Sequence, residues 1–326
     1  MSAAHRIAVT GRIPEPGLDL LRAAGQVWAW TTDDVPALDL VHENVAGCDA
    51  AVTLLTTKVD DAFLDAAGPQ LKVVANVAVG FNNIDVAACA RRGVIATNTP
   101  GVLTDATADI AMALVLMSTR RLGEGERVIR SGTSWQWGMF YLLGTGMQGR
   151  RLGIIGMGAI GVALARRARA FGMTIAYSNR SPVAPALETE LDAAYLSLDE
   201  LLATADVVSV NCPYSPATHH LVDAAALARM KPTAFLVNTA RGPIVDEVAL
   251  AHALSTGIIA GAGLDVFEQE PVVHPGLLAC ENAVLVPHLG SATVETRTAM
   301  ATLAARNAVA VLRGEEPLTP IPAPAT

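Results

Sequence analysis

The feature that most constrains the fold of this chain is a glycine-rich turn, Gly156-Met-Gly158-Ala-Ile-Gly161. A short apolar run, Leu152–Ile155, precedes the turn, and a helical Ala- and Arg-rich segment, Val162–Phe171, follows it. Gly156 permits a tight turn, Gly158 a close approach of backbone to phosphates, and Gly161 close packing of helix on strand. Strand, turn and helix in this order present a helix N-terminus to a pyrophosphate. This context predicts a dinucleotide-binding unit, although the glycine pattern alone also occurs in ordinary loops.

The residues after the next apolar run, Met173–Tyr177, bear on which dinucleotide is bound. An NAD-binding unit carries Asp or Glu about 20 residues past the glycines, where it binds the ribose 2′-hydroxyl. Here the chain has Ser178-Asn179-Arg180-Ser181 and no acid. Arg180, with Asn179 and Ser181 beside it, can hold a 2′-phosphate by charge-assisted hydrogen bonds. We therefore predict NADP (NADPH) as the preferred cofactor, with NAD also possible; the alternative is a solvated turn with an incidental arginine.

Composition predicts a folded chain of two domains with neither a nucleic-acid nor a membrane partner. The 326 residues are 52% hydrophobic and 17% charged, which is enough for a substantial core. A net charge of −8 leaves no basic stripe to engage a nucleic acid. The apolar stretch Ile110–Met117 is too short to span a membrane, and Met1–Thr10 is too short for a signal peptide.

The cysteines and histidines indicate a reduced, cytoplasmic protein without a metal site. Four widely spaced cysteines form no C-x-x-C pair: Cys48, Cys89, Cys212 and Cys280. The adjacent His219 and His220 lack a third ligand at helical spacing, so a structural role is favoured for them over metal binding.

Apolar runs alternate with helical patterns along the whole chain, which predicts an α/β architecture with parallel sheets. We expect strands over Ile7–Thr10, Ala50–Leu55, Val73–Ala75 and Val94–Thr97, and six more from Arg151 onward, over 151–155, 173–177, 207–211, 234–238, 261–266 and 283–287. Expected helices include Gly17–Ala24, Asp61–Ala66, Asp85–Arg92, a long helix from Thr104 to about Arg120, and Val294–Leu312. Because the dinucleotide unit begins in mid-chain, the first part of the chain must form a separate domain. A cleft between the two domains is the expected place for a substrate.

Three residues that could do chemistry follow predicted strands of the second section, where an open α/β sheet places its ligands. Arg241 is suited to bidentate capture of a carboxylate, and His288 to proton exchange with a hydroxyl or carbonyl. Glu270 could orient that histidine and hold it protonated. The alternatives are a surface arginine paired with Asp246 or Glu247, a structural histidine and a solvated acid. Their joint placement at neighbouring strand ends favours an acid–base pair with a carboxylate anchor.

By these residues the chain resembles the D-isomer-specific 2-hydroxyacid dehydrogenases, and within them the glyoxylate/hydroxypyruvate reductase branch. The resemblance covers nearly the whole chain and rests on segments 79–85, 102–109, 153–161, 211–216, 238–247, 265–271 and 287–293. It implies two Rossmann-like doubly wound domains, with the cofactor domain inserted in the substrate-binding (catalytic) domain. The substrate-binding domain would comprise residues 1–100 and 291–326, and the NAD(P)-binding domain residues 101–290. It also implies a homodimer joined through the cofactor domain, in which an aromatic loop, about Trp135–Leu143, reaches toward the neighbouring active site.

The resemblance also implies roles for single residues. Arg241 would bind the carboxylate and carbonyl of a 2-oxo acid, and His288, paired with Glu270, would be the general acid of an NAD(P)-dependent reduction. Leu55 and the backbone amides of Val79 and Gly80 would bind the substrate. Residues lining the cofactor site would be Thr107, Gly156, Gly158, Ala159, Ile160, Gly161, Asn179, Arg180, Ser181, Cys212, Pro213, Thr239, Ala240, Asp265, His288 and Gly290.

The expected reaction is reduction of a small 2-oxo acid, glyoxylate or hydroxypyruvate, to the D-2-hydroxy acid, with NADPH preferred. One alternative is a reductase for bulkier 2-oxo acids such as hydroxyphenylpyruvate, with Leu54, Leu55 and the Trp135–Phe140 loop setting the pocket size. A second alternative, from another class, is an NAD(P)-sensing corepressor-like binding protein, against which stands the lack of partner-binding extensions beyond a short proline-bearing tail. The phosphite-oxidising relatives carry a lysine where this chain has Val79, so that chemistry is not expected.

Overall fold

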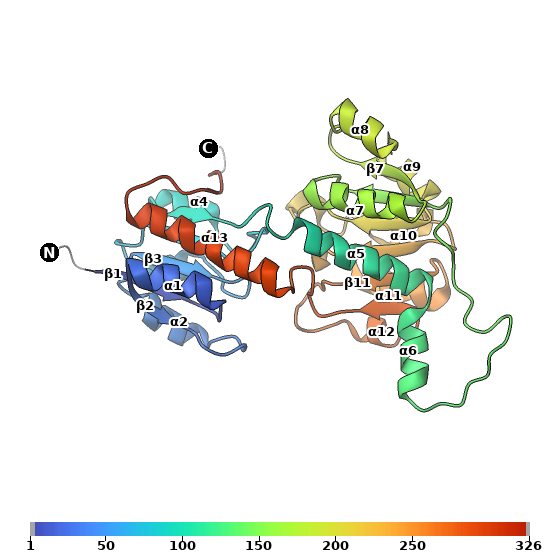
Figure 1. Ribbon diagram of the computed structural model, residues 1–326, viewed down its shortest axis with the longest axis horizontal. Coiled ribbons are helices and arrows are strands. Elements are labelled where there is room, and N and C mark those ends of the chain that lie inside the picture. The colour runs from blue at the N-terminus through green and yellow to red at the C-terminus, as the bar shows by residue number, and fades with distance from the viewer. Residues whose placement is uncertain (1–3, 324–326) are drawn as a thin grey trace. The chain divides into compact units, whose positions relative to one another are not determined.

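The computed structural model describes residues 4–323, and the chain forms two compact units (Figure 1). The first unit comprises Met1–Leu103 and Ala292–Thr326, and the second comprises Thr104–Ser291. The chain therefore passes between the units after Leu103 and after Ser291, rather than after residues 100 and 290. The second unit is an insertion in the first, as the resemblance implies.

The first unit is built on a five-stranded parallel sheet of order β2-β1-β3-β4-β5. This order, 2-1-3-4-5, is one of the two common doubly wound arrangements. Its strands are β1 (His5–Val9), β2 (Gly25–Ala29), β3 (Ala50–Thr53), β4 (Val73–Asn76) and β5 (Ile95–Thr97). Its helices are α1 (Glu15–Ala24), α2 (Leu38–Val45), α3 (Asp61–Ala67), α4 (Val86–Arg91) and α13 (Val294–Leu312).

Both faces of this sheet are covered, so alternate strand residues enter two separate cores. Val9 packs with residues of α1 and α13, whereas its neighbour Ala8 packs with residues of α2, α3 and α4. Burial on both faces explains why the inner strands β3 and β4 read as mainly apolar runs rather than alternating in polarity. The final helix α13 therefore returns the C-terminal part of the chain to the first unit.

The second unit has a seven-stranded parallel sheet of order β12-β11-β10-β9-β6-β7-β8. Its strands are β6 (Arg151–Ile155), β7 (Thr174–Ser178), β8 (Ala193–Tyr195), β9 (Val207–Val210), β10 (Phe235–Asn238), β11 (Gly261–Leu264) and β12 (Ala283–Leu285). Its helices are α5 (Thr104–Thr119), α6 (Leu122–Arg130), α7 (Ala159–Ala170), α8 (Pro185–Leu191), α9 (Leu198–Thr204), α10 (Ala224–Arg229), α11 (Glu247–Thr256) and α12 (Pro275–Leu278), with 3-10 turns η1 (Pro216–Thr218) and η2 (Gly242–Ile244).

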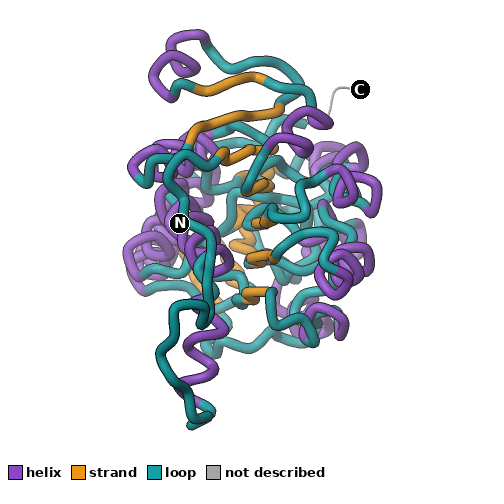
Figure 2. The backbone as a smooth tube through the Cα atoms, turned by 90° about the vertical axis from the view of Figure 1, so that its right-hand side faces the viewer, coloured by secondary structure: helices purple, strands orange, loops and turns teal. Residues whose placement is uncertain are grey.

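The strand order of the second unit reverses at β6, which has β7 on one side and β9 on the other. Ligands of open α/β sheets bind at the carboxyl ends of the strands beside such a reversal. The sheet lies between two helical layers, with Ile154 in the core under α5 and α7 and Ile155 in the core under α9, α10 and α11. Figure 2 shows these strands as a central stack with helices on both sides.

The α/β class and the two doubly wound sheets are confirmed, but two strands are missing from the sequence-based prediction. The second sheet has seven strands rather than six, because β8 adds at its edge, and β2 adds at the edge of the first. Helix α7 begins at Ala159, inside the glycine motif, rather than at Val162. The final helix, Val294–Leu312, has the predicted bounds. No helix within residues 4–323 is long and apolar enough to cross a membrane.

Candidate active site

The glycine turn joins β6 to α7 beside the end of β9. Gly156 has φ +97°, and a Cβ placed on it would meet the backbone of Cys212. A Cβ on Gly161 would lie 2.6 Å from the carbonyl oxygen of Gly156, so the helix packs directly against the turn. Nothing lies within 4 Å of a Cβ at Gly158, the residue that precedes α7. The turn is thus tight on the protein side and open in front of the helix.

The surroundings of this turn fit a dinucleotide. No side chain caps the N-terminus of α7, so the first-turn amides at Ala159 and Ile160 are not satisfied by a capping group. Two buried polar atoms at neighbouring strand ends, Oγ1 of Thr239 and Nδ2 of Asn211, have no hydrogen-bond partner among the described residues. Buried polar groups are rarely left unpaired, so both atoms are available to a ligand. The residues present therefore match a bound dinucleotide at the switch point of the sheet.

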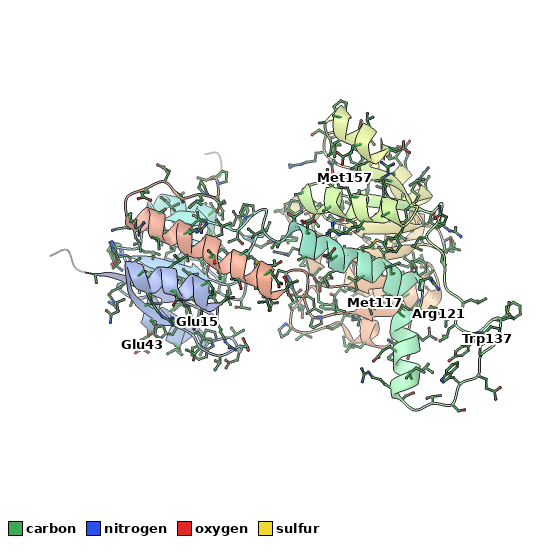
Figure 3. All side chains as sticks on the ribbon, viewed as in Figure 1. Glu15, Glu43, Met117, Arg121, Trp137 and Met157 are labelled. Atoms are coloured by element: carbon green, nitrogen blue, oxygen red, sulfur yellow. The ribbon has the colours of Figure 1, made fainter. Side chains whose placement is uncertain are left out.

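The segment predicted to bind a 2′-phosphate, Asn179–Ser181, follows β7, and its three residues differ in the hydrogen bonds that they form. Oδ1 of Asn179 accepts a hydrogen bond of 2.7 Å from the backbone N–H of Met157, which ties this segment to the glycine turn (Met157 is labelled in Figure 3). The hydroxyl of Tyr195 donates to the carbonyl oxygen of Asn179 at 3.0 Å. Arg180 and Ser181 are exposed, and neither side chain has a hydrogen bond or ion pair with another described residue. Asn179 thus supports the backbone, and Arg180 is the free cation.

Arg241 follows β10 and is half-buried. The buried side chain of Asn238 fixes its backbone, since Nδ2 donates to the Arg241 carbonyl oxygen at 3.0 Å. The guanidinium donates to the Ala240 carbonyl oxygen at 2.7 Å, and no carboxylate among the described residues lies within ion-pairing distance of it. Burial lowers the pKa of Arg241, while the nearby charge of Glu270 acts in the opposite direction. A half-buried cation without a paired anion is suited to bind an anionic ligand.

The alternative of a surface arginine paired with Asp246 or Glu247 is wrong. Asp246 instead caps α11 by accepting from the N–H of Ala249 at 2.9 Å. Glu247 is buried and accepts from the N–H of Glu268 at 2.8 Å, and Glu268 in turn accepts from the N–H of Glu247 at 2.8 Å. Both acids hold their own loops and leave Arg241 free.

Glu270 and His288 form a hydrogen-bonded pair at the ends of β11 and β12. Oε2 of Glu270 lies 2.8 Å from Nδ1 of His288, and Oε1 accepts from the N–H of Phe267 at 3.0 Å. Burial acts to raise the pKa of Glu270, but the bond and charge of His288, the Phe267 amide and the charge of Arg241 together lower it. The carboxylate therefore stays ionised, fixes the imidazole ring and leaves Nε2 for a substrate.

Asp265 holds the loop that carries His288. Its carboxylate, buried at 1% exposure, accepts from the N–H of Leu289 at 2.5 Å and of Gly290 at 2.8 Å. The N–H of His288 donates to the Asp265 carbonyl oxygen at 2.9 Å, and His288 has φ +52°. Burial raises the pKa of Asp265 although both amides act to lower it. Thr107 in the first turn of α5 adds a bond of 3.1 Å to the Gly290 carbonyl. Asp265 and Thr107, which the resemblance assigns to the cofactor site, thus fix the histidine loop.

Other predicted residues occupy neighbouring positions. Cys212 and Pro213 follow β9, and burial raises the pKa of the Cys212 thiol to about 11, which excludes it as a nucleophile near neutral pH. In the first unit, half-buried Leu55 follows β3, and half-buried Val79 and Gly80 follow β4.

Two residues of the site were not singled out from the sequence. Asn211 and Asn238, at the ends of β9 and β10, were missed as site residues, although a polar residue at the end of an apolar strand is a usable signal.

Within residues 4–323 no three His, Cys, Asp or Glu side chains gather as a metal site. A cavity of about 720 Å³ lies at the amino ends of β10, β11 and β12, where Phe235, Ala260 and Asn282 line it. It does not include the predicted site residues.

In one sheet, a histidine is hydrogen-bonded to an ionised carboxylate, an unpaired arginine follows the next strand but one, and a glycine turn fits a dinucleotide. This is the arrangement of a nicotinamide-dependent dehydrogenase. Comparison with known proteins narrows this class. The family model for the D-isomer specific 2-hydroxyacid dehydrogenase, NAD binding domain, matches residues 112–290. The chain belongs to the D-isomer specific 2-hydroxyacid dehydrogenase family.

Individual relatives match over nearly their full length. The glyoxylate reductase of Thermococcus onnurineus is 46% identical over 319 residues, covering 96% of this chain and 95% of the relative. That of Korarchaeum cryptofilum is 47% identical over 315 residues, covering 96% and 94%. Among solved structures, the NADPH-dependent glyoxylate/hydroxypyruvate reductase of Sinorhizobium meliloti in complex with NADP and malonate has a TM-score of 0.85 and 37% identity, covering 98% of this chain and 97% of that one.

Proposed function

We propose that this protein reduces glyoxylate and hydroxypyruvate to their 2-hydroxy acids, the D isomer where the product is chiral, with NADPH as the preferred cofactor. The observation that carries the proposal is the hydrogen-bonded Glu270–His288 pair with the unpaired Arg241 at adjacent strand ends. The glyoxylate reductases at about 45% identity support the choice of a small 2-oxo acid.

The residues of the site divide the work of reduction. A bound nicotinamide supplies the hydride that reaches C2 of the 2-oxo acid. Arg241 binds the substrate carboxylate and its carbonyl oxygen, on which negative charge develops. His288 donates its Nε2 proton to that oxygen, and Glu270 stabilises the imidazolium before transfer. In the first unit, Leu55 and the amides of Val79 and Gly80 bind the substrate.

The cofactor is assigned to the glycine turn and the strand ends around it. We assign to it Thr107, Gly156, Gly158, Ala159, Ile160, Gly161, Asn179, Arg180, Ser181, Cys212, Pro213, Thr239, Ala240, Asp265, His288 and Gly290. Support comes from the open N-terminus of α7 and the unpartnered Thr239 hydroxyl. The preference for NADPH is supported by exposed, unpaired Arg180 in place of an acid. The Sinorhizobium meliloti structure with NADP agrees with it.

A homodimer is supported by the loop after α6. Trp137, Met139 and Phe140 are 78%, 72% and 88% exposed, and Figure 3 shows Trp137 on this projecting loop. Contiguous exposed apolar side chains of this kind mark protein–protein contacts. Sedimentation analysis of the protein and of a Phe140→Ser variant tests this: we expect a dimer that the variant weakens, and a monomeric wild type contradicts it. A cytoplasmic location is supported by four free cysteines.

One assay tests the proposed function. The absorbance of NADPH or NADH is followed with glyoxylate, hydroxypyruvate, pyruvate or phenylpyruvate at equal low concentrations. We expect the highest kcat/KM for glyoxylate and hydroxypyruvate with NADPH, and D-glycerate as the product of hydroxypyruvate. Preference for phenylpyruvate indicates the bulkier-acid reductase instead. No turnover with any of the four acids contradicts the proposal.

A further inference from the structure

Three successive peptide carbonyls after β4 are each held by a separate donor. The carbonyl oxygen of Ala78 accepts from the N–H of Thr99 at 2.8 Å. That of Val79 accepts from Nδ2 of Asn98 at 2.7 Å, and that of Gly80 accepts from Nδ2 of Asn76 at 3.1 Å. All three donors lie on the two strands next to this segment or directly after them, so the segment is fixed from the protein side.

The fixed carbonyls determine where the amides point. These peptide bonds are trans, and in a planar trans peptide the N–H lies opposite the C=O. The N–H groups of Val79, Gly80 and Phe81 therefore point away from the three donors. None of the three donates a hydrogen bond to another described residue. The side chain next to them, Phe81, is 41% exposed, so this part of the segment is accessible to a ligand.

Asn98 is itself anchored by the C-terminal segment. Its backbone carbonyl accepts from Oγ1 of Thr319 at 2.6 Å, and its N–H donates to the Thr319 carbonyl at 3.3 Å. Thr319 is in turn fixed by Asn307, a residue of α13 with 0% exposure, through bonds of 2.7 and 3.0 Å. Thr319 is therefore a structural support of Asn98.

We propose that Asn98 is a positioning residue for the 2-oxo acid: by holding the Val79 carbonyl, its side chain aims the Gly80 N–H at the substrate carboxylate. Thr319 supports it through the backbone. This inference rests on the proposed function, because it takes the carboxylate of the 2-oxo acid as the ligand of these amides. Asn98 does not touch the substrate; its effect passes through the orientation of one peptide.

The test compares Asn98→Leu with a matched control, Asn44→Leu. Asn44 lies in α2 of the same unit, and its Nδ2 also donates to a backbone carbonyl, that of Leu40 at 2.8 Å. In Asn98→Leu we expect the KM for glyoxylate and the inhibition constant of oxamate, an unreactive analogue, to rise at least about tenfold. The KM for NADPH is expected to stay within about twofold, because the dinucleotide turn is in the other unit. Asn44→Leu is expected to change only the melting temperature.

The outcomes separate the inference from the proposed function. If Asn98→Leu shifts KM for glyoxylate no more than Asn44→Leu does, the positioning role is wrong while glyoxylate reduction stands. If wild-type protein reduces no 2-oxo acid, the proposed function fails first. Should Asn98→Leu not fold, Thr319→Val serves as the weaker variant, with a smaller rise in the same two constants. Amide NMR of the wild type with oxamate then decides: shifts at Gly80 support the inference, and unshifted Gly80 with bound oxamate overturns it.

Discussion

Nδ1 of His288 lies 2.8 Å from Oε2 of Glu270, although the two residues belong to loops after different strands. Asp265, at the end of β11, accepts from the amides of Leu289 and Gly290 and so joins the two loops a second time. The pair is thereby held by the sheet itself, and Nε2 is the ring nitrogen left for proton transfer. This geometry makes the charge and the pH dependence of the pair directly testable.

Glu270→Gln keeps a hydrogen-bond acceptor beside His288 but removes the negative charge. We expect kcat/KM for glyoxylate reduction at neutral pH to fall by about a hundredfold, the lower end of general acid catalysis. Steady-state kinetics of both proteins with glyoxylate and NADPH measure the loss, and equal kcat/KM values contradict the pairing.

The same variant has a defined effect on stability. The pKa of Glu270 is lowered in the folded protein, so its ionised form stabilises the fold above the unfolded value of about 4.3. That contribution is lost as pH falls through the lowered pKa. The difference in melting temperature between wild type and Glu270→Gln should therefore shrink on acidification below about pH 4. A difference that grows on acidification shows that the sign is wrong.

Arg241 is the second group whose removal has a specific consequence. Arg241→Ala should lower kcat/KM by about 10²- to 10³-fold, as expected for loss of one stabiliser of the developing charge. Arg241→Lys should recover only part of this, because an ammonium lacks the bidentate fork. Added guanidinium ion should partly restore the Ala variant. Arg166→Ala is the control, since Arg166 forms an exposed ion pair with Glu190 at 2.8 Å. Equal activities of the two Ala variants contradict the anchoring role.

The parts of the fold that could be predicted are those with a strong local signal. The hydrophobic pattern of the sequence predicts the long final helix α13 and the apolar strands that are buried on both faces of their sheets. Strands β2 and β8 lie at sheet edges and are only partly buried. Neither stands out along the chain, because β2 (Gly25–Ala29) follows α1 without a loop and β8 (Ala193–Tyr195) has three residues. Helix α6 has no buried residue, and nothing in a core selects it.

The candidate site divides in the same way. Residues at strand ends, such as Arg241 and His288, follow from the topology of a parallel sheet. The supporting bonds of Asn98, Asp265 and Asn179 do not, because each joins residues distant in sequence through backbone groups. The type of a polar side chain does not predict which distant loop it will bond to. The supports of the site therefore needed the structure.

Gly242 packs where no side chain fits. A Cβ at this position would overlap the carbonyl group of Phe267 and the N–H of Glu268, which are backbone atoms and cannot rotate away. Gly242→Ala must separate the Arg241 loop from the Glu270 loop, and we expect it to lower the free energy of unfolding by about 1–3 kcal/mol. Urea denaturation measures this. Gly146→Ala is the control, since nothing lies within 4 Å of its Cβ. Equal midpoints for the two variants contradict the packing argument.

We predict that Arg180 determines the choice between the two nicotinamide cofactors. It is exposed and unpaired among the described residues, at the position where NAD-binding units carry an acid. Arg180→Ala should raise the KM for NADPH by about 10- to 100-fold through loss of charge-assisted bonds to the 2′-phosphate, and leave that for NADH within about twofold. The wild-type KM for NADPH should also rise with salt more steeply than that for NADH. Arg229→Ala, which removes an exposed partner of Asp199, controls for general loss of positive charge. An equal rise for both cofactors in Arg180→Ala assigns the arginine to the fold of the loop and overturns its role in selectivity.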